Sequence, residues 1–266
     1  MPRSSSASAT VRWPVAMSDT TIRGPVAGSD RGPFGNRKPW PERYRELADQ
    51  ARDPRLQAFY RTGCPAADTP IAEVPLVALD FETTGLDAEW DSIVSIGLVP
   101  FTLAAIRPGE GQHWLVKPKK SLSRTSVTIH GITHSDLQQA PDIGERFGEL
   151  LSALAGRVPV VHYRGIEQPF LNAALQWRLQ ESIQFPVLDT MEIEAHLHPD
   201  RQPALWQRLL GKKPVSIRLA DSRRRYNLPH YASHNAMVDA LATAELLQAQ
   251  IQHHFSPQTP IGDLWL

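Results

Sequence analysis

From about Ile71 onward, hydrophobic positions follow two different periods. Short apolar runs have strand length, whereas longer stretches repeat their apolar positions every three to four residues, as amphipathic helices do. Three strand-like runs come first, and helix-like and strand-like stretches then alternate up to residue 254. This order predicts an α/β domain with a mixed sheet covered by helices. The strand-like runs are VPLVALDFETTG, DSIVSIGLVPF, HWLVKP, VPVVHY and FPVLDT, and the helix-like stretches are IGERFGELLSALAG, IEQPFLNAALQWRLQES, SIRLADSRRRYN and HNAMVDALATAELLQAQIQHH.

The region before this domain divides in two by composition. Residues 1–38 are rich in Ser, Arg, Gly and Pro without sustained periodicity, so we expect a disordered tail or an overlong start, with Met17 as the alternative first residue. An organelle presequence is a further alternative, because the first 17 residues carry Arg and Ser and no acid. From Pro39 the apolar spacing is helical, and Pro54 separates two short helices. We therefore expect a tail (1–38), an N-terminal helical extension (39–70), the main domain (71–255) and a C-terminal tail (256–266).

Composition limits the partners that the chain can take. Its 28 Lys and Arg residues balance 28 Asp and Glu residues, so any nucleic-acid contact must come from a local patch rather than from net charge. The single cysteine, Cys64, excludes an intrachain disulfide and favours a reducing compartment. No apolar run has the length of a membrane span. We expect a cytoplasmic protein with no membrane partner.

Acidic residues stand where the first strand leaves the core. Asp80 and Glu82 are two residues apart, so a strand points both to one face and Phe81 to the other. Carboxylates at the end of a buried strand need a positive partner, which a divalent metal or an arginine can provide. His234 and Asp239 are five apart, a spacing that suits one shared site if His234 lies in the loop entering the last helix. From these residues alone, the metal and the arginine stay open as alternatives.

Three segments in this order resemble the exonuclease motifs of the DnaQ-like DEDDh superfamily: DFETTG, HYRGIEQPFL and HNAMVDA. The resemblance covers residues 71–252, and IHGIT and VLDT look like intervening segments found in many members. It implies a ribonuclease H-like fold, with a mixed five-stranded sheet flanked by helices. It also implies a metal-dependent 3′–5′ exonuclease that releases nucleoside 5′-monophosphates from the 3′ end of DNA or RNA by a two-metal mechanism. The matching positions, implied by the resemblance, are Asp80, Glu82, Glu167 and Asp239 as the four acids and His234 as the general base.

The second motif departs from the family pattern, which reads His-Asn, three residues, then Asp. Here HYRGIE places Tyr163 at the usual Asn and Glu167 at the usual Asp. The alignment through Phe170 needs no gap, so we take Glu167 as the substituted acid. Its charge is kept, and its side chain is one methylene longer. Altered metal preference, lower activity and a lost site are the alternatives.

The expected cofactors are two divalent ions, Mg²⁺ or Mn²⁺, because the candidate ligands are carboxylates rather than His or Cys clusters. We expect Asp80 to bridge both ions, Glu82 and Asp239 to hold the ion on the nucleophile side, and Glu167 to hold the other. Histidine side chains titrate near neutral pH, so His234 is suited to take the proton from the attacking water.

Substrate contacts are expected from the turn after the first acids and, by resemblance, from the segment around residue 130. The turn comprises Thr83, Thr84 and Gly85, for which an ordinary turn is the alternative, and the resemblance adds His130 and Ile132. Basic runs at 117–124 and 223–226 are candidates for phosphate contacts, although charge runs are more often solvated surface.

Two further readings stay open beside the exonuclease. A catalytically weakened module on the same fold would bind nucleic acid or a protein partner without cutting, and Glu167 would mark the loss. A proofreading subunit would need a DNA polymerase or repair partner, and we find no tethering segment for one. The expected partner is a single-stranded 3′ end, and the sequence does not separate DNA from RNA.

Overall fold

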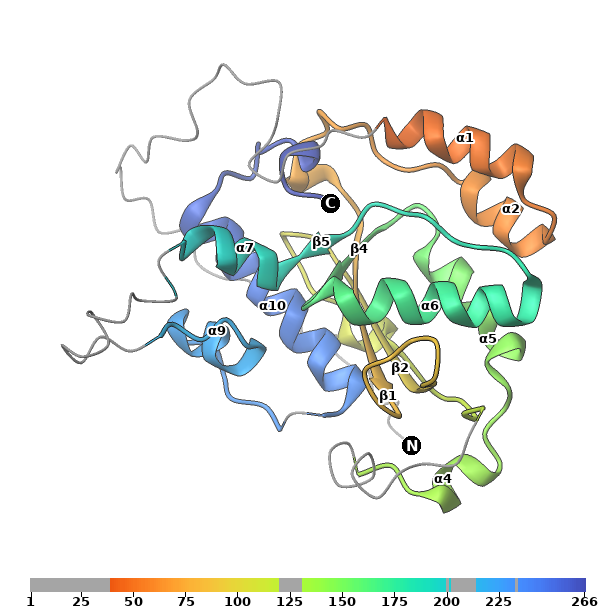
Figure 1. Cartoon of the computed structure of the whole chain (residues 1–266). Coiled ribbons are helices and arrows are strands. Elements are labelled where there is room, and N and C mark those ends of the chain that lie inside the picture. The colour runs from red at the N-terminus through yellow and green to blue at the C-terminus, as the bar shows by residue number, and fades with distance from the viewer. Residues whose placement is uncertain (1–38, 120–130, 200, 202–213, 233) are drawn as a thin grey trace, which may run out of the picture.

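The computed structural model describes residues 39–119, 131–199, 201, 214–232 and 234–266. Their central feature is a five-stranded sheet in the order β3-β2-β1-β4-β5. β1 (Leu76–Thr83) is antiparallel to β2 (Ile93–Phe101), which is antiparallel to β3 (Gln112–Leu115). β1 is also parallel to β4 (Val158–Val161), and β4 is parallel to β5 (Leu188–Asp189). The predicted mixed sheet is confirmed, and the strand that carries the first two acids lies at its centre (Figure 1).

Helices flank this sheet, as the alternating pattern predicts. The longest described helix, α10, packs against β1 and β2, while α6 contacts β1 and α5. Two short helices, α4 and α7, were not predicted, because one has five residues and the other begins directly after the two-residue strand β5. The helix bounds are α4 (His134–Gln138), α5 (Ile143–Leu154), α6 (Arg164–Leu179), α7 (Thr190–Leu197), α9 (Leu219–Arg225) and α10 (Ala236–His254).

Two helices precede the sheet: α1 (Trp40–Gln50) and α2 (Pro54–Arg61). Their contact is aromatic, and the rings of Tyr44 and Tyr60 meet edge to face with centroids 5.3 Å apart. α2 also packs on α5, which fixes the pair against the main domain. The helical spacing seen from Pro39 onward is thus confirmed, whereas the expectations for residues 1–38 lie outside the described residues.

The last residues return to the segment that precedes β1. Ile71 donates its amide to the carbonyl of Thr259, and Ile261 donates its amide to the carbonyl of Thr69, each at 2.9 Å. Trp265 is 1% exposed, so this end of the chain is part of the core. Within the described part of the chain, no helix combines the length and the apolar character that crossing a bilayer requires.

β1 is buried on both of its faces. Its first four residues, Leu76 to Leu79, are at most 1% exposed, which fits the continuous apolar run of a central strand. The run ends at Asp80, where the strand approaches the N-terminus of α10. A polar group in this place has little water around it and must find its partners within the protein or in a ligand.

Candidate active site

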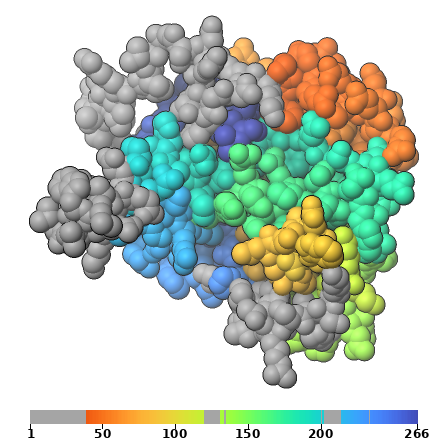
Figure 2. Space-filling model, in the orientation of Figure 1, coloured from red at the N-terminus to blue at the C-terminus, as the bar shows by residue number. Residues whose placement is uncertain are grey.

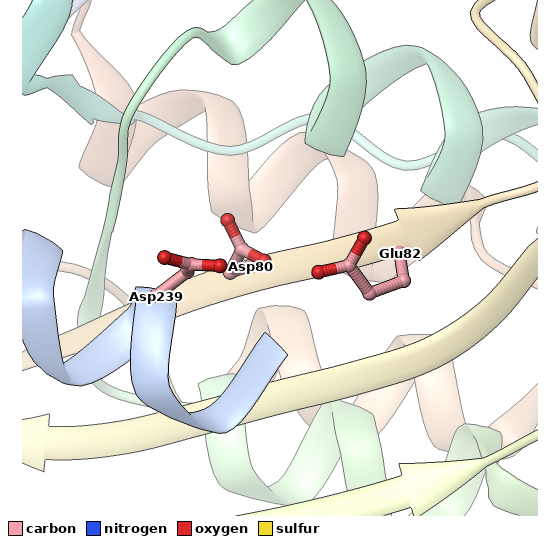
Figure 3. A group of neighbouring side chains, drawn as sticks. All are labelled: Asp80, Glu82 and Asp239. Atoms are coloured by element: carbon pink, nitrogen blue, oxygen red, sulfur yellow. The ribbon is translucent and has the colours of Figure 1, made fainter. Parts of the chain in front are cut away.

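Three carboxylates from two distant segments meet at the end of β1. Asp80 and Glu82 lie on that strand, and Asp239 lies in the first turns of α10. One oxygen from each lies within 4.8 Å of the others, a group that can hold a metal ion. Figure 3 shows the three side chains gathered between the strand and the helix. The structure therefore brings together three of the four predicted acids.

Gly97 on β2 allows α10 to approach this closely. It pairs with Asp80 across the β1–β2 ladder, so both positions point to the same face of the sheet. A Cβ at Gly97 would lie 2.2 Å from the backbone carbonyl of Ala236, at the start of α10. Any larger residue would push the helix, and with it Asp239, away from β1. Sequence reasoning did not single out Gly97, because only the packed helix shows why the side chain is missing.

The N-terminus of α10 holds Asp239 in place. The backbone amides of His234 and Asn235 donate to its Oδ2 at 2.7 and 3.1 Å, while the Asn235 side chain caps the helix by accepting from the Val238 amide. His234 has a φ of 70°, which turns the chain sharply before the helix. The histidine thus lies in the entering loop, as its spacing predicts, and its side chain is exposed.

The acids repel each other when the site holds no cation. Loss of water contact, followed by the charges of Glu167, Asp239 and Glu82, raises the pKa of Asp80 well above its ordinary value. Burial and the charge of Asp239 raise the pKa of Glu82 to about 7. Burial also raises the pKa of Asp239, although its two amide donors oppose that shift. A bound cation would reverse these shifts by stabilising the ionised carboxylates.

Glu167 lies on the neighbouring helix α6, in its first turns. It is 3% exposed, and burial raises its pKa well above the ordinary value while the amide of Phe81 lowers it. Its charge contributes to the raised pKa of Asp80, so the two carboxyl groups are electrostatic neighbours. It lies outside the tight triplet of Asp80, Glu82 and Asp239. Its Oε2 atom is buried and finds no hydrogen-bond partner among the described residues.

Asp189 organises the helices around Glu167, a role that sequence reasoning missed. This buried carboxylate ends β5 and accepts from the amides of Tyr163 and Arg164 at 3.0 and 2.8 Å. It also accepts from the Met191 amide at 2.9 Å and so caps α7. One side chain therefore fixes the N-termini of both helices. An Asp directly before a helical stretch is an N-cap pattern, and this pattern in the sequence could have indicated the capping role of Asp189.

The turn after β1 is held by its own side chains. The Thr83 hydroxyl donates to the carbonyl of Gly85 at 2.6 Å, and the Thr84 hydroxyl donates to Asp91 at 2.9 Å. The Thr84 amide donates to the Ser92 carbonyl at 2.9 Å. A Cβ at Gly85 would lie 2.3 Å from the Asp91 carboxylate. Figure 2 shows this yellow segment raised on the surface in front of the green α6 region.

The remaining predicted contacts fall in different places. His130 lies outside the described residues, and Ile132 packs beside a small apolar cluster of Val94 and Leu137. Lys119 places its ammonium 4.3 Å from the ring centroid of Trp177, near the C-terminal end of α6.

In the basic run at 223–226 the buried Arg223 is not available to a phosphate, so the prediction is wrong for that residue, whereas Arg224 and Arg225 are exposed and stay candidates. Arg223 is 4% exposed and pairs with Glu245 at 2.7 Å, and it also donates to the carbonyl of Pro229 at 2.9 Å. Arg225 and Tyr226 both bind the buried Glu194. These side chains are used to fix α9 against α10 and α7, because a buried arginine must be paired within the fold.

A cluster of carboxylates that can hold a divalent cation, at the end of the central strand of a mixed sheet, defines a class: metal-dependent nucleases on a ribonuclease H-like fold. The family model for exonucleases (RNase_T) matches residues 77–247, which is more than half of the chain. The chain belongs to this exonuclease family, within the DnaQ-like superfamily that its motifs resemble.

Individual relatives agree with the family. DNA polymerase III PolC-type from Thermotoga maritima is 31% identical over 180 residues, which cover 67% of this chain and 12% of that protein. DNA polymerase III subunit epsilon from Treponema pallidum is 29% identical over 181 residues, which cover 68% of this chain and 78% of that protein. The nuclease domain of 3′hExo, a DEDDh family member, matches the fold with a TM-score of 0.55 at 13% identity, over 68% of this chain and 92% of that domain. The match thus spans only about an eighth of the PolC-type relative.

Proposed function

We propose that this protein shortens nucleic-acid strands from their 3′ end by hydrolysing phosphodiester bonds and releasing nucleoside 5′-monophosphates. The observation that carries this proposal is the convergence of Asp80, Glu82 and Asp239, with one oxygen of each within 4.8 Å of the others. A phosphodiester carries negative charge, so a site built only of carboxylates cannot approach it unless cations lie between them.

The residues present fit divalent cations. All candidate ligands are carboxylate oxygens, which suit Mg²⁺ or Mn²⁺. The buried Oε2 of Glu167 has no partner among the described residues and is the kind of orphaned oxygen that a cation satisfies. The charges of Glu167, Asp239 and Glu82 all act on Asp80 and raise its pKa. Asp80 would therefore be the shared ligand, with Glu82 and Asp239 on one ion and Glu167 on the second.

Two divalent ions bound there would supply positive charge to the attacking and leaving oxygens of the scissile phosphate. The carboxylates hold and orient these charges, and burial on the apolar strand keeps competing water away.

His234 is the residue that moves a proton. It is exposed in the loop directly before α10, and its charge acts on the carboxylate of Asp239. It would accept the proton of the attacking water as that water bonds to phosphorus. The hydrogen bond from its own amide to Asp239 fixes the loop that presents the ring.

The substrate is a strand with an accessible 3′ end, and the turn of Thr83 to Gly85, which directly follows Glu82, is the candidate for contacts to it. The PolC-type and epsilon relatives are parts of DNA polymerase III by name, and the 3′hExo domain was crystallised with rAMP. These relatives support both deoxyribose and ribose strands as substrate classes. A polymerase or repair partner and a cytoplasmic location stay predictions.

The test uses the full chain and 5′-labelled single strands of DNA and of RNA, with Mg²⁺, Mn²⁺ or EDTA. We expect stepwise shortening from the 3′ end with either metal and none with EDTA. Asp80→Asn, which removes the shared ligand charge while keeping the shape, should abolish cleavage. Asp49→Asn changes an exposed aspartate on α1 and should cleave as the wild type does.

Cleavage that survives in Asp80→Asn, or release of labelled mononucleotide from the 5′ end, would contradict the proposal. The weakened-module alternative makes a different prediction. In that case the wild type binds a strand but does not cut it, and Glu167→Asp restores cutting.

A further inference from the structure

Tyr163 stands in a backbone conformation that a bulky residue rarely adopts. It precedes α6 with φ 92° and ψ 80°, in the left-handed region. Only glycine enters this region without steric cost, and Asn or Asp tolerate it better than an aromatic residue. The residue at the N-cap of a helix is usually Ser, Thr, Asp, Asn or Gly. The polar side chains in this set accept a hydrogen bond from an amide of the first turn, and glycine adopts the N-cap backbone without steric cost. The local structure therefore gives no reason for a tyrosine here.

The surrounding fold enforces this conformation. The buried carboxylate of Asp189 accepts from the amides of Tyr163 and Arg164 at 3.0 and 2.8 Å, so both amides must point inward. Strained backbone that is held in this way occurs most often where a side chain must be presented in one orientation.

The side chain that results is rigid and exposed. Tyr163 is 52% exposed, although the hydroxyl end of its ring rests on the first turn of α6. A Cβ at Gly165 would lie 2.7 Å from Cζ of Tyr163, so the missing side chain at Gly165 makes room for the ring. An aromatic face that is fixed at its base and open to solvent is a surface for stacking.

Tyr163 stands one helical turn before Glu167, at the N-terminus of α6. The carbonyl of Tyr163 accepts from the amide of Ile166 at 3.2 Å, and Glu167 follows in the next position of the helix. Glu167 in turn acts on Asp80 through its charge. The exposed ring is thus one helical turn from the carboxylate that would hold the second cation at the terminal phosphate.

We propose that Tyr163 stacks on a nucleobase of the bound strand, within the last few nucleotides of its 3′ end. This inference rests on the proposed function and adds a substrate-binding residue to the same site. Stacking on an aromatic ring is tolerant of base identity, since every base has a flat face, so the contact favours single strands with unstacked bases over duplex ends.

The experiment measures binding separately from cleavage. Fluorescein-labelled single strands of 12 nucleotides with hydrolysis-resistant phosphorothioate linkages are titrated in Mg²⁺, and unmodified strands of the same sequence are tested for shortening in the same buffer. A second set carries one abasic residue at the first, second or third nucleotide from the 3′ end. The variants are Tyr163→Gly, which removes the ring and relieves the positive φ, and Tyr163→Phe, which keeps the ring. Trp177→Ala is the matched control, because Trp177 is a 42% exposed aromatic residue at the other end of the same helix.

We expect Tyr163→Gly to bind about 5- to 100-fold more weakly, the loss of one base stack, and to raise KM more than it lowers kcat. Its thermal midpoint should be unchanged or higher, since glycine is unstrained at this φ. An abasic residue at one position should weaken the wild type by a similar factor and should not weaken Tyr163→Gly further. Tyr163→Phe and Trp177→Ala should bind as the wild type does.

Equal affinity of Tyr163→Gly and wild type would overturn the inference. The inference would also be overturned if Tyr163→Gly and the abasic residue lowered the affinity independently, so that their factors multiply at all three positions. A loss of affinity in Trp177→Ala equal to that in Tyr163→Gly would overturn it as well. A wild type that binds but does not shorten the strand contradicts the proposed function alone, and the binding data still decide the role of Tyr163. A wild type that neither binds nor shortens overturns both.

Discussion

Glu82 provides the sharpest test of how the acid cluster is built. It is 8% exposed, and burial together with the charge of Asp239 raises its pKa from the reference value of 4.5 to about 7. Replacing it with glutamine keeps the shape and removes the ionisable proton. The comparison of Glu82→Gln with the wild type, without metal, therefore isolates the free energy of ionising one buried carboxyl group.

The direction in which the free energy of unfolding changes with pH follows from whether folding binds or releases a proton. Between pH 4.5 and about 7 the folded protein keeps the Glu82 proton while the unfolded chain has lost it, so folding binds a proton. The free energy of unfolding then falls as pH rises through this window and becomes constant above it. At about 1.4 kcal/mol for each pH unit, the gap from 4.5 to about 7 amounts to about 3 kcal/mol, of which roughly 2–3 kcal/mol falls between pH 5 and pH 8.

Urea denaturation at pH 5, 6, 7 and 8 in EDTA measures this difference. We expect Glu82→Gln to gain roughly 2–3 kcal/mol over the wild type on going from pH 5 to pH 8. The buried His162, whose pKa is lowered to about 4 by burial, destabilises both proteins equally at acid pH and cancels in the difference. Glu73→Gln changes an exposed glutamate and should show a difference from the wild type that does not vary with pH.

Adding Mg²⁺ or Mn²⁺ should stabilise the wild type most at pH 8, where the carboxylates are ionised, and should stabilise Glu82→Gln less. A stability difference between wild type and Glu82→Gln that stays flat from pH 5 to pH 8 would refute the reasoning, because Glu82 would then be as well solvated in the fold as in the unfolded chain.

Two other substitutions test the geometry. Gly97→Ala would place a methyl group 2.2 Å from the α10 backbone, and we expect it to lower the free energy of unfolding by about 1–3 kcal/mol in urea and the cleavage rate by more than tenfold, since Asp239 moves with the helix. Gly109→Ala, where a Cβ meets nothing within 4 Å, is the control, and equal effects of the two would contradict the packing argument. His234→Asn, which tolerates the φ of 70°, should lower the cleavage rate by about 10²- to 10⁴-fold. A full cleavage rate in His234→Asn would show that His234 is not the proton acceptor.

The order of the elements could be predicted from local patterns, because each pattern reports its own geometry. The continuous apolar run before Asp80 predicts a buried central strand, and that strand lies in the middle of the sheet with its first four residues at most 1% exposed. Period two predicts that Asp80 and Glu82 share a face, and the structure places both beside Asp239. The short helices α4 and α7 were not predicted, since α4 has only five residues and α7 begins directly after the two-residue strand β5.

What the tertiary structure alone decided is how near the segments come to each other. The sequence determined that carboxylates stand at the end of one strand and at the start of one helix, because strand and helix periods are local properties of the chain. It could not show that Gly97 lets the helix backbone approach β1, that Asp189 fixes two helix ends, or that Tyr163 is held in a left-handed conformation. These features depend on contacts between residues far apart in the chain, whose distances follow only from the packing of the whole fold.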